Sequence, residues 1–197
     1  MLTPVDALRR ADREFSSRLA LVPKTAWGEQ SACEDWSVGD LVDHVVGGNV
    51  FTIEILGGSD TATAMEAAIA GATSGAARRR GAYDESAREM LECLAADDAL
   101  GQSYAHFGGT MSGAEVAALR CEDIALHAWD LANSIGADEH LEPALIEFVW
   151  ERMSRRSHEL EASGRYGAGS RGDLADGASL QARLLDITGR NPGRALA

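Results

Sequence analysis

The sequence predicts an all-α protein, an antiparallel four-helix bundle with additional helices at its C-terminal end. Apolar residues recur at helical spacing in several segments of the 197-residue chain, and residues suited to helix caps border these segments. The chain shows no alternation of strands and helices, no glycine-rich phosphate loop and no repeat. Because a chain of this length can bury a core unaided, we expect one domain over residues 1–197, in which a metal would be functional rather than structural.

The first two predicted helices cover residues 3–23 and 37–58. A threonine and a proline at the start of the first segment suit a helix cap and the first helical position. After a loop over residues 27–35, Ser37 begins the second helix, and Asp40 follows three residues later in a capping-box pattern. Two consecutive glycines end this helix.

The third and fourth predicted helices are separated from the second by a segment with little apolar bulk. Residues 59–81 are rich in alanine, threonine and glycine, and we expect a linker with a weak helix there. Helical periodicity resumes over residues 83–94. A loop over residues 101–111 then leads to the fourth helix, which Ser112 caps and Gly136 ends. Apolar residues occupy much of its surface, so we expect neighbouring helices to enclose it.

Three further segments follow the fourth helix. Residues 143–160 form an amphipathic pattern that predicts a helix, and residues 178–188 predict a last short one. Between them, residues 163–177 are rich in glycine and arginine and are expected to form a surface loop.

Composition narrows the class of function. The formal net charge of −13 at pH 7 disfavours binding to nucleic acid or to an anionic membrane surface, and the arginines at residues 78–80 are expected to form a solvated helix face. The N-terminus lacks the pattern of a secretory signal, and no apolar run approaches the roughly 18 residues of a membrane span. Cys33, Cys93 and Cys121 lack CxxC spacing. We expect them to be small buried hydrophobic residues in a protein of the reducing cytoplasm.

The chemically informative residues are two histidines and an aspartate. Asp123 and His127 are four residues apart on the fourth helix, so both side chains project from one face and can reach one ion. His44 lies midway along the second helix, and we expect it on the buried stripe that also carries Leu41 and Gly48. Taken singly, His44 also suits a core position, and the other two also suit a surface ion pair.

Together, these three residues predict a metal site between two helices. Inward-facing histidines and carboxylates are how helical bundles build such sites, and an unpaired buried aspartate is costly. Two histidines and one carboxylate leave coordination positions free, as in catalytic zinc sites, and the set also suits nickel or iron.

Several residues near the predicted ligands each suit two different roles. Asp130 lies near the ligand face and can orient a histidine or a water from the second shell of the metal, or satisfy a buried arginine or a backbone group. His106 is either an acid, base or extra ligand at the mouth of the bundle or an exposed loop residue. Trp36 and Trp129 are expected to pack in the core rather than to form a platform for substrate.

Three strings of the sequence resemble a known family. They are C-E-D-W-S-V-G-D-L-V-D-H-V-V-G-G at residues 33–48, R-C-E-D-I-A-L-H-A-W-D-L-A at residues 120–132 and L-L-D-I-T-G-R-N-P at residues 184–192. In this order they are similar to the mycothiol-dependent maleylpyruvate isomerase-like group of the DinB-like superfamily of metal-binding proteins. The resemblance covers most of the chain and implies a four-helix bundle with a metal ion held by His44, Asp123 and His127.

The resemblance also implies an activity. It suggests a metal-dependent thiol transferase or isomerase in which the divalent ion, zinc first and nickel or iron next, activates mycothiol or polarises the carbonyl of a small electrophilic substrate. The partners would be this substrate and the low-molecular-weight thiol, with a second copy of the chain as a homodimer. The family's isomerase carries glutamate where this chain has Asp123, and it has an extra C-terminal domain for which the residues after Leu160 are too few.

Two alternatives stay open. In the first, the chain is a non-catalytic metal- or ligand-binding module of the same superfamily, with an apolar patch of Leu145, Phe148 and Trp150 left for another subunit. In the second, the bundle binds no metal and His44 is a core residue.

Overall fold

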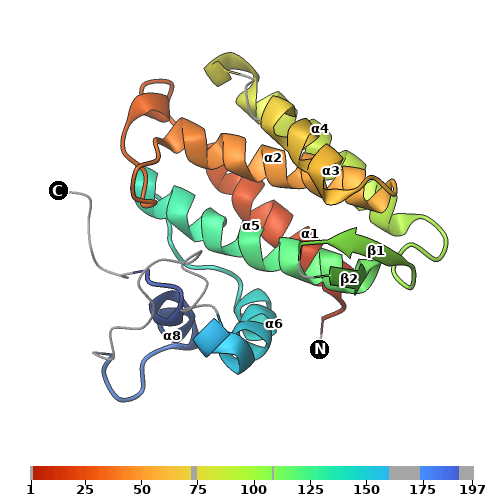
Figure 1. Cartoon of the computed structure of the whole chain (residues 1–197). Coiled ribbons are helices and arrows are strands. Elements are labelled where there is room, and N and C mark those ends of the chain that lie inside the picture. The colour runs from red at the N-terminus through yellow and green to blue at the C-terminus, as the bar shows by residue number, and fades with distance from the viewer. Residues whose placement is uncertain (1, 72–74, 108, 160–173, 191–197) are drawn as a thin grey trace. The chain divides into compact units, whose positions relative to one another are not determined.

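The computed structural model describes residues 2–71, 75–107, 109–159 and 174–190 (Figure 1). The chain divides into two compact units, Thr3–Glu139 and His140–Ala197, the latter together with the first two residues. One domain over residues 1–197 therefore stays a prediction. Within the described ranges, no helix combines the length and the apolar character that crossing a membrane requires.

The unit Thr3–Glu139 is mostly helical. Its four long helices are α1 (Pro4–Leu19), α2 (Val38–Leu56), α4 (Gly75–Ala95) and α5 (Gly113–Ile135). Helix α1 packs against α4 and α5, and α2 packs against the same two helices, as Figure 1 shows. A short 3-10 helix, Ala26–Gly28, lies in the connection between α1 and α2. The packing of α2 on α5 positions the residues of the predicted metal site.

Caps at the ends of α2 and α5 confirm the boundaries read from the sequence. Ser37 and Asp40 form a complete capping box, in which each side chain accepts a hydrogen bond from the other residue's backbone N–H. Ser112 and Glu115 form a second one at the start of α5. Gly136 ends α5 in the left-handed conformation, with φ of 66°, which favours glycine.

The prediction of a linker with a weak helix over residues 59–81 is right about a helix and wrong about a linker. The chain forms α3 (Thr61–Gly71) there, and α4 begins at Gly75, ahead of the predicted start at residue 83. Helix α3 packs against α2 and buries Ala64 and Ala68. Small side chains on this face allow the two helices to approach closely, so α3 needs no large apolar residues to bury a face.

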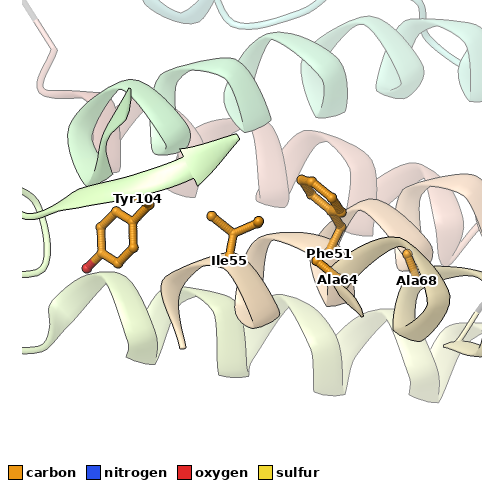
Figure 2. Packing of buried hydrophobic residues seen from close by; sticks show 5 residues of the cluster. All are labelled: Phe51, Ile55, Ala64, Ala68 and Tyr104. Atoms are coloured by element: carbon orange, nitrogen blue, oxygen red, sulfur yellow. The ribbon is translucent and has the colours of Figure 1, made fainter. Parts of the chain in front are cut away.

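The loop predicted over residues 101–111 is also wrong in part, because it contains a β-hairpin. Strands β1 (Ser103–His106) and β2 (Gly109–Ser112) pair antiparallel. Tyr104 on β1 is buried and joins a core cluster of residues from α2 and α3, drawn in Figure 2. The cluster consists of Phe51, Ile55, Ala64, Ala68 and Tyr104. Burial of this tyrosine helps to fix the hairpin on the helices.

The second unit contains α6 (Pro143–Met153), a 3-10 turn (Ser154–Arg156) and α8 (Leu180–Ile187), and α6 packs against α8. Residues 157–159 are helical beyond that turn, so the helix predicted over residues 143–160 is interrupted by it. The surface loop predicted over residues 163–177 lies mostly outside the described residues.

The apolar patch considered for residues 145, 148 and 150 is not an exposed surface. Leu145 is fully buried, and Phe148 and Trp150 are half-buried. The guanidinium carbon of Arg183 lies 4.8 Å from the centre of the Trp150 ring, and the polar end of the arginine thereby covers this ring.

Candidate metal centre

The three predicted ligands meet between α2 and α5. Oδ1 of Asp123 lies 3.6 Å from Nε2 of His44 and 3.6 Å from Nε2 of His127. The spacing of four residues on α5 brings Asp123 and His127 together, and the packing of α2 on α5 adds His44. One ligand atom from each residue lies within 4.8 Å of the other two.

These separations suit a single cation. Bonds of 2.0–2.1 Å in a tetrahedral site place neighbouring ligand atoms about 3.3 Å apart, so small side-chain movements complete the geometry. The His44 side chain is 40% exposed and that of His127 is 10% exposed. The expectation that His44 lies on the buried stripe is therefore wrong: it stands at the rim of the α2–α5 contact, and it leaves one side of the cluster accessible. That a metal binds here stays a prediction.

Arg120 divides the roles of the two Asp123 oxygens. Its guanidinium donates a hydrogen bond to Oδ2, while Oδ1 faces the two imidazoles. Burial alone would raise the pKa of Asp123. The neighbouring His127, Arg120 and His44 outweigh this effect and hold the pKa well below the usual range of an aspartate. The group is therefore a carboxylate at neutral pH, which is the form that ligates metals.

Asp130 lies behind His127. Its Oδ2 is 2.9 Å from Nδ1 of His127, and the residue is 1% exposed. With the Nδ1 proton donated to this carboxylate, Nε2 of His127 carries a lone pair toward Asp123 and His44. This carboxylate–histidine arrangement is typical of metal sites, where it fixes the tautomer and the ring orientation.

Cys33 also belongs to this neighbourhood, so the expectation that it is a small buried hydrophobic residue is wrong. Its Sγ lies 3.4 Å from Oδ2 of Asp130 and 4.0 Å from Nδ1 of His127, and the side chain is half-buried. The loop before α2 is held at α5 because the backbone N–H of Ala32 donates to Ser134 Oγ at 2.9 Å. The one indication in the sequence was that Cys33 stands in the same family-like string, residues 33–48, as His44.

The two tryptophans differ. The Trp36 ring is half-buried, with its centre 4.8 Å from that of His44 and 6.0 Å from that of His127, so it borders the cluster. Trp129 is 3% exposed and lies in the core, as expected. His106 lies on β1 with its ring centre 5.5 Å from that of Phe51, and no metal-binding group found among the described residues includes it.

Comparisons with known proteins identify the family of this chain. Residues 8–132 match the family described as the mycothiol maleylpyruvate isomerase N-terminal domain. The chain belongs to this family. The match covers most of α1, all of α2 and most of α5, and it therefore includes His44, Asp123, His127 and Asp130.

The chain is also similar to two relatives and to two solved structures. Two uncharacterized proteins of Mycobacterium tuberculosis, from the Oshkosh and H37Rv strains, are each 31% identical over 147 residues, which is 73% of this chain and 74% of theirs. The fold is similar to that of the crystal structure of the mycothiol-dependent maleylpyruvate isomerase, with a TM-score of 0.66, 19% identity and coverage of 85% of this chain and 72% of that one. The structure of a variant of that enzyme with a histidine replaced by alanine matches with the same TM-score and coverage, at 18% identity.

Proposed function

We propose that the chain is a metal-dependent enzyme of the mycothiol-dependent type, a thiol transferase or isomerase that acts on a small electrophilic substrate. The observation that carries the proposal is the convergence of one oxygen and two imidazole nitrogens on a single point, with 3.6 Å between Asp123 Oδ1 and each Nε2. Membership of the mycothiol maleylpyruvate isomerase N-terminal domain family supports the proposal that the thiol is mycothiol.

His44, Asp123 and His127 would hold one divalent ion, for which zinc suits the ligand set and nickel or iron also fit. Three ligands would leave a coordination position free, and the 40% exposure of the His44 side chain makes the cluster accessible from solvent. When bound, the ion lowers the pKa of a thiol that coordinates it, so that thiolate forms at neutral pH.

The protein's own residues orient and enclose the centre. Asp130 holds Nδ1 of His127 and so directs Nε2. Trp36 packs beside His44 and restricts its ring. In the same proposal, α1, α2, α4 and α5 form the antiparallel four-helix bundle of DinB-like proteins, and two copies of the chain associate as a homodimer.

The test is thiol consumption by the metal-loaded protein in the presence of mycothiol and a panel of electrophiles that includes maleylpyruvate. We expect turnover with the loaded protein, none after removal of the metal by a chelator, and recovery when zinc is added back. His44→Ala should abolish turnover, whereas His140→Ala should not, because His140 is an exposed histidine outside the cluster.

Metal binding without turnover across the whole panel would contradict the enzyme proposal and favour a metal- or ligand-binding module. Turnover that survives complete metal removal, or that survives His44→Ala, would contradict the proposed role of the metal centre.

A further inference from the structure

Arg120 is a buried cation that connects α5 to α2. The residue is 6% exposed. Its Nε donates to Asn49 Oδ1 at 2.9 Å, its Nη2 donates to the backbone oxygen of Val45 at 2.6 Å, and its Nη1 donates to Asp123 Oδ2. Burial of a charge is costly unless hydrogen bonds compensate it, and these three acceptors provide that compensation.

Gly48 on α2 provides the space for this guanidinium. A Cβ atom built at Gly48 would lie 2.7 Å from Cζ of Arg120, closer than real Cβ contacts allow. The glycine is in the interior of a helix, where glycine is less favourable than alanine. The close approach of Arg120 gives a physical reason for glycine at this position.

The amide of Asn49 extends the arrangement to α4. Its Nδ2 donates to Ser86 Oγ at 3.1 Å, and Ser86 Oγ donates to the backbone oxygen of Tyr83 at 3.1 Å. Asn49 and Ser86 are both buried. Arg120 is therefore held by groups whose own positions are fixed by packing and hydrogen bonds, and it cannot follow Asp123 if that side chain rotates.

We propose that Arg120 is a positioning residue that restricts Asp123 to ligation through Oδ1 alone, and that Gly48 is required because it admits Arg120. This inference rests on the proposed metal centre. A carboxylate with one oxygen engaged by a guanidinium binds a cation through the other oxygen only, which keeps the coordination number low and a position free for a thiol. The positive charge of Arg120 also offsets the negative charge of the Asp123 carboxylate. The carboxylate would therefore neutralise less of the positive charge of a bound metal ion.

The same unit contains a matched control. Arg79 on α4 crosses α2 at Gly39, where a built Cβ would lie 2.7 Å from Cζ of Arg79. It pairs with both oxygens of Asp43, Nε to Oδ1 at 2.9 Å and Nη2 to Oδ2 at 2.7 Å. This second arginine–glycine–aspartate crossing includes none of the three proposed ligands.

The experiment compares Gly48→Ala with Gly39→Ala. The zinc Kd is measured by competition with a chromophoric chelator, and the absorption spectrum of the cobalt-loaded protein reports the coordination number. We expect Gly48→Ala to weaken zinc binding about tenfold or more, the range for loss of an outer-shell partner, and to shift the cobalt spectrum toward a higher coordination number. Gly39→Ala should change neither the Kd by more than about twofold nor the spectrum.

A second variant covers the case in which Gly48→Ala does not fold, as judged by circular dichroism. Arg120→Lys keeps the charge, but its N–H donors all sit on one nitrogen and lack the spacing with which the Arg120 guanidinium reaches Asn49, Val45 and Asp123 through three different nitrogens. We expect it to show the same weakening of zinc binding and the same change in the cobalt spectrum.

The outcomes separate this inference from the proposed function. Unchanged zinc affinity and cobalt spectrum in the folded Gly48→Ala and Arg120→Lys proteins would overturn the positioning role while leaving the metal centre in place. Equal losses of affinity in Gly48→Ala and Gly39→Ala would overturn it as well, because the effect would then come from general loosening of α2. Absence of zinc binding by the unmodified chain would instead contradict the metal centre itself.

Discussion

Replacement of Asp130 tests whether zinc affinity depends on a residue outside the proposed ligand set. The Asp130 carboxylate is 2.9 Å from Nδ1 of His127 and 1% exposed, so solvent screens this contact little. Loss of such an outer-shell partner costs about 10–100-fold in metal affinity, which corresponds to about 1.4–2.7 kcal/mol. Asp130→Asn keeps a neutral acceptor and should lie near the tenfold end, whereas Asp130→Ala removes the acceptor and should lie near the hundredfold end.

The assay is the zinc Kd, measured by chelator competition on protein confirmed to be folded by circular dichroism. Asp43→Asn serves as the control, because Asp43 is also a charge-paired aspartate of this unit but pairs with Arg79 rather than with the cluster. It should lower stability without changing the zinc Kd by more than about twofold. Equal zinc affinity in the unmodified protein and in both Asp130 variants would refute the assigned role of Asp130.

Three further predictions concern the fold, its acid stability and the rim of the site. Ile55→Ala should lower the free energy of unfolding in urea by about 2–5 kcal/mol, since the side chain is 1% exposed within the cluster of Figure 2; a loss below about 1 kcal/mol would contradict that packing. Hydrogen bonds from Ser37 lower the pKa of Asp40 from its usual 3.8, so its contribution to stability is present above that pH and is lost as the pH falls through the lower folded-state value. Asp40→Asn should therefore reduce the dependence of stability on pH below about 4, and an unchanged acid profile would contradict the capping role. Trp36→Leu should weaken zinc binding by releasing the His44 ring, whose centre lies 4.8 Å from that of Trp36, and an unchanged zinc Kd would show that the indole only fills space.

The helices with strong local signals were predictable from the sequence. Ser112 at the start of α5 and Gly136 at its end mark boundaries that follow from capping chemistry and from the left-handed conformation of the glycine. Only a weak helix was predictable where α3 forms, because Ala64 and Ala68 bury a face without the large apolar residues that periodicity detects. The hairpin was missed because its strands have four residues each and bury little beyond Tyr104.

The proximity of the three proposed ligands was predictable from the sequence, and their surroundings were less so. The four-residue spacing of Asp123 and His127 places both on one face. The approach of His44 depends on packing between helices, and it was inferred only because two histidines and a carboxylate together are typical of metal sites in bundles. Arg120 stands three residues before Asp123 on the same helix, but its burial depends on the space at Gly48, which is a tertiary property. The contact of Cys33 likewise arises from the path of a loop.

Metal analysis of the chain purified without a histidine tag tests the central claim most directly. We expect inductively coupled plasma mass spectrometry to find about one divalent ion per chain. A folded double variant, His44→Ala with His127→Ala, should lose this ion because it retains a single proposed ligand. A folded, untagged chain that takes up no zinc, nickel or iron from solution, or a double variant that keeps the full complement of metal, would contradict the account.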